Sequence, residues 1–260
     1  MKKPNLKHDN SGQVLVITAL LVALLLLSTT LYVIETEKGV PTGGTSSENN
    51  VFPAHKQDTR NTLISALANI TNGGETSVLT SNLNELISVV TAHSYQAILK
   101  MEATPLNIAP YQNGIWVSWG TNGQGISSTY ASFVFASSGP SATSELEYTV
   151  NITSEVNLSG SYLQLEGNLK QVNLTVNILN EGKPALAQNF TFYYEFDGSL
   201  TIEDWVKVDS PSTINLGNGT YAVSFIAETG MPNDPVLVSM HCQDQRDILV
   251  KANVTCTNIG

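Results

Sequence analysis

The sequence has few charged residues, and basic residues are especially scarce. Only 13% of its 260 residues are charged, with 12 Lys and Arg against 22 Asp and Glu, which gives a formal net charge of −10 at pH 7. Contacts with nucleic-acid phosphates or anionic lipid need clustered Lys and Arg. The composition therefore disfavours both, and no nucleic-acid partner is predicted. An acidic, hydroxyl-rich surface suits a cell exterior, where repulsion limits nonspecific association.

Cysteine is almost absent, with only Cys242 and Cys256 in the chain. We expect the segments around them to form a simple hairpin that turns at residues 243–246. In that hairpin Cys242 lies near Ile248, and Cys256 lies near Asp234. Strand geometry then separates the two sulfurs by more than about 20 Å, whereas a disulfide needs Cα atoms within about 7 Å. The prediction is two separate, mostly buried thiols.

Motifs for catalysis and metal binding are also lacking. The sequence has no nucleophile elbow, no H-E-x-x-H and no EF-hand loop. His241 and Cys242 are neighbours in an expected strand, so they point to opposite faces and cannot easily share an ion. Glu203 and Asp204 diverge in the same way, which disfavours a glycosidase pair. We predict no catalytic residue, no metal and no cofactor, with an extracellular hydrolase as the remaining enzyme hypothesis.

One long apolar run stands out near the start of the chain. Residues 14–34 carry no charge, and as a helix they would span about 30 Å, the thickness of a bilayer core. The run is longer than a secretory h-region and ends without an A-x-A cleavage pattern. It predicts a transmembrane helix at 13–35 with the lipid bilayer as partner.

Charges on either side of this run predict its orientation. Lysines precede it and glutamates follow it: Lys2, Lys3, Lys7, Glu35 and Glu37. Because Lys and Arg stay on the cytoplasmic side, residues 1–12 are expected to be a cytoplasmic leader. The C-terminal domains are then extracellular, and the chain is a single-pass protein of the cell membrane.

The junction before the run resembles the class III leader of type IV pilins, especially archaeal ones. Ser11-Gly12-Gln13 directly precedes the apolar stretch, and the pattern G-Q-x-L-x-x-x-A-L is similar to the start of tight-adherence pseudopilins. The resemblance implies cleavage between Gly12 and Gln13. It also implies a filament in which Val14–Ile34 helices pack against those of identical or homologous subunits.

Beyond the run, composition and periodicity divide the chain. Residues 36–50 are rich in Gly, Ser and Thr and predict a flexible linker. An α+β extracellular domain is expected at 51–165, beginning with helices at 57–71 and 82–101, where apolar residues recur at helical spacing. From residue 113 the period changes to two. Strands are then predicted at 115–119, 129–136, 146–158, 172–178, 190–196, around Trp205, at 216–226 and in the two arms of the cysteine hairpin.

The last segment resembles immunoglobulin-like or fibronectin-like surface modules. Gly182-Lys183-Pro184 and Gly219-Thr220-Tyr221 occupy places where those modules carry similar short motifs. The resemblance implies a C-terminal immunoglobulin-like β-sandwich at 166–260 that serves display or adhesion. It also implies that the Tyr221 hydroxyl caps an inter-strand corner.

Seven N-x-S/T sequons are candidate glycosylation sites if the chain lies outside the cytoplasm. They are Asn69, Asn151, Asn157, Asn173, Asn189, Asn218 and Asn253. Their number is close to that expected by chance in a sequence so rich in Asn, Ser and Thr.

These observations favour a membrane-anchored extracellular protein with a structural or adhesive role, in the form of a filament subunit, a pseudopilin or an anchored display domain. The alternative is a monomeric anchored binding module that recognises a glycan or a soluble ligand through loops of the sandwich. Whether the leader is cleaved separates the two hypotheses.

Overall fold

The computed structural model describes residues 48–92, 98–120, 122–138, 143–197 and 205–260. The expected leader, the apolar run at 13–35 and the cleavage site at Gly12 and Gln13 lie outside these residues. The chain divides into two compact units, Met1–Ala54 and His55–Gly260. The description below concerns the second unit, together with the helix that leads into it.

No helix among the described residues is long and apolar enough to cross a membrane. This finding contradicts the single-pass architecture and the cell-membrane localisation expected from the sequence, since both required such a helix. The physical reason differs for the two described helices. The first, α2 (Glu48–Thr71), carries charged side chains through its middle, including Lys56, Asp58 and Arg60. The second, α3 (Ser77–Ala92), has only 16 residues, about 24 Å of helix against a bilayer core of about 30 Å.

The two helices pack through short apolar stripes. Leu63, Ala66 and Leu67 are fully buried on α2, and Leu79 and Leu83 are buried on α3. These spacings of three and four residues place the apolar side chains on one face of each helix. Asn72-Gly73-Gly74 separates the helices, and Gly73 has a φ of +103°, a conformation that glycine adopts without strain.

Helix α3 ends earlier than the periodicity predicts. The pattern of apolar residues suggested a helix to residue 101, but α3 stops at Ala92, and residues 98–105 form strand β1 (Ile98–Pro105). Leu99 and Met101 are buried on β1 while Lys100 and Glu102 are exposed. The segment that alternates with a period of two is short, so the sequence pattern alone could not distinguish it from the last turn of an amphipathic helix.

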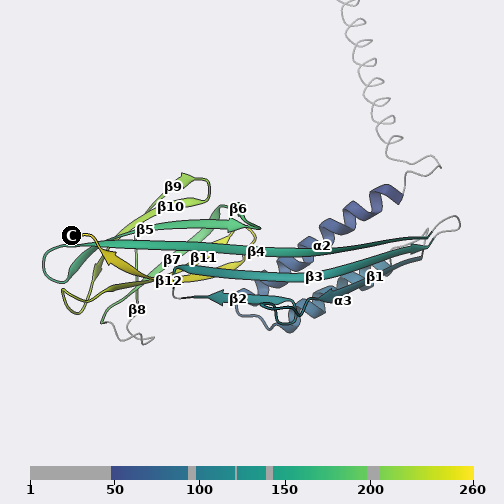
Figure 1. Ribbon diagram of the computed structural model, residues 1–260, viewed down its shortest axis with the longest axis horizontal. Helices are drawn as coiled ribbons and strands as arrows, with labels where there is room; N and C mark the ends of the chain where they lie inside the picture. The colour runs from purple at the N-terminus through teal and green to yellow at the C-terminus, as the bar shows by residue number, and fades with distance from the viewer. Residues whose placement is uncertain (1–47, 93–97, 121, 139–142, 198–204) are drawn as a thin grey trace, which may run out of the picture. The chain divides into compact units, whose positions relative to one another are not determined.

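The strands among the described residues after α3 are joined in one sheet network (Figure 1). After β1 the strands are β2 (Ile115–Trp119), β3 (Gln124–Ser138), β4 (Thr143–Gln164), β5 (Leu169–Asn180), β6 (Lys183–Pro184), β7 (Ala187–Glu195), β8 (Trp205–Lys207), β9 (Ser212–Gly217), β10 (Thr220–Glu228), β11 (Val236–Asp244) and β12 (Leu249–Asn258). The main path is β8-β7-β11-β12-β4-β5-β10-β9. β3 joins it through β4 and also pairs with β1 and β2, and β6 pairs with β5.

Strand β4 is the central element of this network and the reason that the expected fold class is wrong. Its 22 residues pair with β3 from Thr143 to Asn157 and with β5 from Ser154 to Gln164. One continuous strand therefore belongs both to the part that carries the helices and to the part that follows. The structure is mostly β, with a single 12-stranded sheet network in place of an α+β region followed by a separate immunoglobulin-like sandwich.

The core of the C-terminal part lies between two layers of this network. Inward residues of β10 meet those of β7, as two ring contacts show: Phe190 lies 4.9 Å from Tyr221 and Tyr194 lies 6.2 Å from Phe225, between ring centroids. The buried residues around them are aliphatic or sulfur-containing: Val172, Leu174, Val176, Ile178, Val223, Val236, Val238, Met240, Cys242, Val250, Ala252 and Cys256. The opposite side of β5 and β10 is open and forms the surface discussed below.

Candidate functional sites

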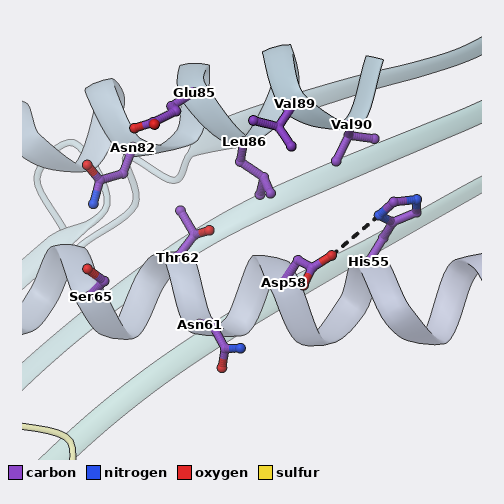
Figure 2. Close-up of a pocket in the computed structure, with 10 residues that line it drawn as sticks. All are labelled: His55, Asp58, Asn61, Thr62, Ser65, Asn82, Glu85, Leu86, Val89 and Val90. Atoms are coloured by element: carbon purple, nitrogen blue, oxygen red, sulfur yellow. Dashed lines mark ion pairs between the residues drawn. The ribbon is translucent and has the colours of Figure 1, made fainter. Parts of the chain in front are cut away.

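A groove of about 750 Å³ lies between α2 and α3 (Figure 2). It is open to solvent and has a mixed lining, which includes the hydroxyl of Thr62, the amide of Asn82 and the apolar side chains of Leu86 and Val90. Two acidic residues, Asp58 and Glu85, also line it. This chemistry suits a polar or cationic ligand.

His55 lies at one end of the groove. Its Nδ1 is 3.6 Å from a carboxylate oxygen of Asp58, and its ring stacks on Phe135 of β3 at 5.5 Å between centroids. Beside it, the hydroxyls of Thr59 and Tyr148 share a hydrogen bond of 3.1 Å. These contacts hold α2 against β3 and β4, so the groove wall is fixed on the α2 side.

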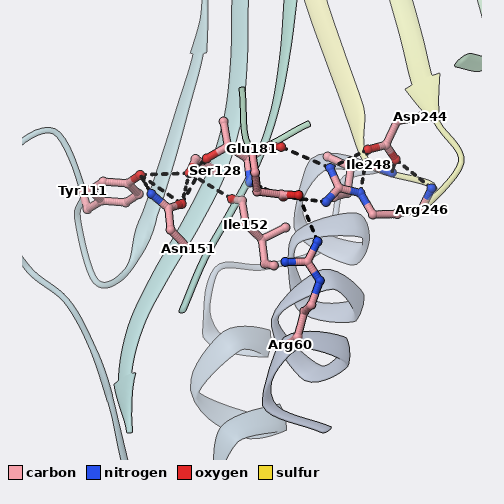
Figure 3. Close-up of polar contacts among 10 residues, drawn as sticks. Arg60, Tyr111, Ser128, Asn151, Ile152, Glu181, Asp244, Arg246 and Ile248 are labelled. Atoms are coloured by element: carbon pink, nitrogen blue, oxygen red, sulfur yellow. Dashed lines mark hydrogen bonds and ion pairs between the residues drawn. The ribbon is translucent and has the colours of Figure 1, made fainter. Parts of the chain in front are cut away.

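A cluster of charged residues joins four distant segments (Figure 3). Glu181, in the turn between β5 and β6, accepts from Arg246 at 2.6 Å and from Arg60 of α2 at 2.9 Å. Arg246 follows β11 and also donates to Asp244 from Nε at 2.9 Å. Its remaining guanidinium nitrogen donates to the carbonyl of Thr153 on β4 at 3.1 Å. The cluster therefore fixes α2 and two turns to the middle of β4.

Burial and hydrogen bonding act in opposite directions on the carboxylates of this cluster. Partial burial of Glu181 opposes its ionisation, but hydrogen bonds from Arg246 and Arg60 outweigh burial and lower its pKa. Asp244 has no exposed side-chain surface. Its Oδ1 accepts from the backbone N–H groups of Arg246 at 2.8 Å and Ile248 at 3.1 Å. Because its oxygens are bonded within the protein, the cluster is built for anchoring.

A second polar network lies on the β2–β3–β4 region, also drawn in Figure 3. The Tyr111 hydroxyl lies 2.9 Å from Ser128 Oγ and accepts from the Asn151 amide at 3.1 Å. Ser128 is fully buried and also contacts the carbonyl of Ile152 at 2.9 Å. Tyr111 packs edge-on against Trp116, with 5.9 Å between centroids. This network closes the loop before β2 onto the sheet.

The histidine and thiols of β11 and β12 are held in unreactive states. Burial, with a contribution from Lys251, lowers the pKa of His241 to about 4. Burial raises the pKa of Cys242 to about 12, with a contribution from Asp244, and burial alone raises that of Cys256 to about 12. At neutral pH the histidine is therefore neutral and a weak base, and the thiols are protonated, which makes the thiols poor nucleophiles and poor metal ligands.

The two cysteines are separate and buried, which confirms the prediction of free thiols. Cys242 lies opposite Val250 and Cys256 lies opposite Val236. The register is thus two residues away from the expected one, but the separation along the hairpin holds. Across the described ranges, no group of three His, Cys, Asp or Glu side chains is placed to hold a metal ion.

The open side of strands β4, β5, β10 and β9 forms a broad surface, here called the outer face. Its members are paired across the strands and are exposed or half-buried: Asn157, Ser159, Ser161, Leu163, Leu165, Leu169, Gln171, Asn173, Thr175, Asn177, Ser212, Ile214, Leu216, Thr220, Ala222, Ser224, Ile226 and Glu228. Glu228 is the one charged residue among them, and Glu155 borders the face on the same side of β4, where it accepts from the Asn157 amide at 3.1 Å. Six exposed apolar side chains stand among the amides and hydroxyls: Leu163, Leu165, Leu169, Ile214, Leu216 and Ile226, of which Ile226 is 52% exposed.

The single lysine of β5 does not contribute charge to the outer face. Lys170 is fully buried on the inward side, where its Nζ donates to the carbonyl of Asp234 and lies 5.1 Å from the centre of the Tyr162 ring. Burial lowers the pKa of Lys170, and Asp234 partly opposes this effect. The neighbours Leu169 and Gln171 point outward instead, so the face stays nearly free of charge.

The residues predicted as glycosylation sites are spread over several elements. Asn69, Asn151, Asn173, Asn189 and Asn218 are exposed, whereas Asn157 and Asn253 are half-buried. The side-chain amides of Asn151 and Asn157 donate to Tyr111 and to Glu155. Glycosylation at any of them stays a prediction.

Tyr221, the residue expected at an inter-strand corner, is buried on β10. Its hydroxyl accepts a hydrogen bond of 3.0 Å from the backbone N–H of Ala187, at the start of β7. The bond joins two layers of the sheet network.

Sequence reasoning did not find the charged cluster. Arg60, Glu181 and Arg246 come from segments more than sixty residues apart, and no local motif marks such contacts. In the structure Glu181 has a φ of +48°, a conformation that the Asn-Glu-Gly turn permits but that does not by itself mark Glu181 as part of a cluster. The outer face, in contrast, was visible as the alternation of Asn173, Thr175 and Asn177 with apolar residues.

The chain matches no known protein family, and no curated protein matches it. Functional inference therefore depends on the surfaces and clusters described above.

Proposed function

We propose that this protein has a structural or adhesive role and works by associating through its surface. The observation that carries the proposal is the outer face. In a chain of net charge −10, a sheet surface with exposed leucine and isoleucine and one charged residue is a place where another protein surface can approach without repulsion.

The charged residues of the second unit support this proposal. Arg60, Glu181, Asp244 and Arg246 are paired with one another and hold segments together. The two thiols, Cys242 and Cys256, are buried, and their raised pKa values keep them protonated and unreactive at neutral pH. Perturbed groups at catalytic sites usually shift toward reactivity at neutral pH.

Sedimentation velocity of the full chain over a concentration series tests the proposal. A structural protein of this kind is expected to show reversible self-association, seen as a sedimentation coefficient that rises with concentration. A matched measurement on Ile226→Glu, which adds charge to the outer face, is expected to weaken the association. A chain that remains monomeric at every concentration and does not adhere to other surfaces would contradict the proposal.

A ligand-binding module is the second candidate, and the groove between α2 and α3 favours it. The groove offers carboxylates at Asp58 and Glu85 beside the apolar side chains of Leu86 and Val90. This lining suits a ligand with a cationic group and a hydrocarbon portion. The site lies between helices, so the loops of the sheet network, where binding was expected from the sequence, are not its location.

Calorimetry with a linear diamine and with a neutral diol of the same length would test this second function. Binding of the diamine that is lost in Glu85→Gln and kept in Glu75→Gln would support it, because Glu75 is an exposed acid outside the groove. Equal weak heats for both compounds would remove the groove from consideration.

A further inference from the structure

Edge strands of a sheet expose unpaired backbone N–H and C=O groups, and proteins usually protect them with charge, proline or short length. Three edges among the described strands follow this rule. β1 carries exposed Lys100 and Glu102 and ends in Pro105. β8 has only three residues, one of them Lys207, and β6 consists of Lys183–Pro184.

Strand β9 lacks all of these protections. Its sequence, Ser-Thr-Ile-Asn-Leu-Gly, contains no charge and no proline, and all six positions are exposed. Ile214 is 58% exposed and Leu216 is 60% exposed. β9 pairs with β10 on one side, and in the described part of the sheet its other side has no strand partner.

β2 is the other uncharged edge, but it is much less accessible. Only Val117 and Ser118 are exposed among its five residues. Trp116 packs against Tyr111, and the Trp119 ring lies 4.8 Å from the ammonium group of Lys251. Among the described strands, β9 is therefore the uncharged edge whose residues are all exposed.

We propose that β9 pairs with β9 of a second copy of this chain, so that two sheets join into one. The inference deepens the proposed function, on which it rests, by naming the partner and the element that binds it. Antiparallel pairing of a strand with its own copy has twofold symmetry, so the outward N–H and C=O groups of one copy meet their complements in the other.

The twofold symmetry of antiparallel self-pairing is the reason to choose a second copy over another partner, and the charge distribution permits it. Two copies of a chain with net charge −10 repel each other unless they meet where charge is absent. β9 carries none, and its neighbour β10 carries only Glu228 at its far end, beyond Ile226. Pairing along β9 brings Ile214 and Leu216 of both copies together and extends the outer face across the junction.

The direct test places a lysine on the edge, with a matched control elsewhere. Ile214→Lys puts a charge into the proposed junction. Ile108→Lys makes the same change at a residue of similar exposure, 54% against 58%, in the loop before β2. Sedimentation of the full-length variants is expected to show self-association weakened at least about tenfold in Ile214→Lys, equivalent to ~1.4 kcal/mol, and unchanged in Ile108→Lys.

Cross-linking adds a readout of position, because it reports which residues of the two copies lie close together. Asn215→Cys lies in the middle of β9, and Asn233→Cys is an exposed control in the loop before β11. The natural cysteines are buried, so mild oxidation should produce a disulfide dimer of Asn215→Cys and not of Asn233→Cys.

The outcomes separate the two proposals. Self-association that persists in Ile214→Lys, without a cross-link through Asn215→Cys, would overturn pairing through β9 while leaving the structural function in place. Association driven by the apolar run at 14–34 would give this result. Absence of self-association in the unaltered chain would overturn both. If Asn215→Cys formed a disulfide with an added cysteine-containing peptide but not with a second copy, the partner of β9 would be a strand of another molecule. That result would also overturn the proposal.

Discussion

The charged cluster around Glu181 and the outer face of β4, β5, β10 and β9 use charge in opposite ways. In the cluster, arginines and carboxylates from three segments are brought within 3 Å of one another and are partly removed from water. On the outer face, one charged residue stands among amides, hydroxyls and exposed apolar side chains. The difference shows that charged residues stabilise the fold in the cluster, whereas the outer face has few charged residues and is exposed to solvent.

Breaking the cluster at its buried member should have the largest effect. Asp244→Ala removes one of three acceptors of the Arg246 guanidinium and the acceptor of two backbone N–H groups in a buried site. Loss of one partner of a buried ion pair costs about 3–5 kcal/mol. Urea unfolding should show this loss of stability. Asp209→Ala, which removes an exposed acid, should change stability by less than about 0.5 kcal/mol. Equal small effects would mean that the cluster does not secure the fold.

The two sides of β4 offer the next comparison. A Cβ at Gly160 would lie 2.5 Å from Cys256 Sγ and 2.7 Å from Leu174 Cδ2. Because both contacts are closer than packing allows, Gly160→Ala should cost about 1–3 kcal/mol by overpacking. Ser159→Ala, one residue away on the outer face, should be nearly neutral. If thermal unfolding moved equally in both variants, the assignment of an inner and an outer side would be wrong.

These contrasts also show how far the sequence alone could lead. The alternation in β5 predicted a strand with one polar side, and hairpin geometry predicted two separate thiols, because both depend on neighbours in the chain. The sequence could not predict that β4 is one continuous strand, because its length depends on pairing with β3 and then with β5, which are separate segments of the chain. The prediction of a single strand at 216–226 was wrong for a local reason. Asn218, with a φ of +53°, turns the chain there and creates the β9–β10 hairpin.

A smaller effect should appear in the pH dependence of stability. His241 has a pKa of about 4 in the folded chain, below its usual 6.5, because burial and Lys251 oppose its protonation. As the pH falls, the unfolded chain takes up the proton first. Stability from this group is therefore complete above pH 6.5 and is lost between pH 6.5 and about 4.

Urea unfolding at a series of pH values measures this dependence. Replacing His241 with Gln should flatten the profile between pH 6.5 and 4.5. Below pH 4.5 a further loss should remain, because the lowered pKa of Glu181 makes its protonation favour the unfolded chain. If the pH dependence of stability between pH 6.5 and 4.5 were unchanged in His241→Gln, a group other than His241 would be responsible for it.

The salt dependence of self-association tests the central claim most directly, namely that copies of this chain meet where charge is absent. Salt screens the repulsion between two chains of net charge −10. An uncharged junction contains no ion pair that salt could weaken. Sedimentation of the full chain at increasing salt should therefore show association that is unchanged or stronger. Association that weakens steadily with salt would mean that opposite charges hold the copies together, and it would contradict the claim.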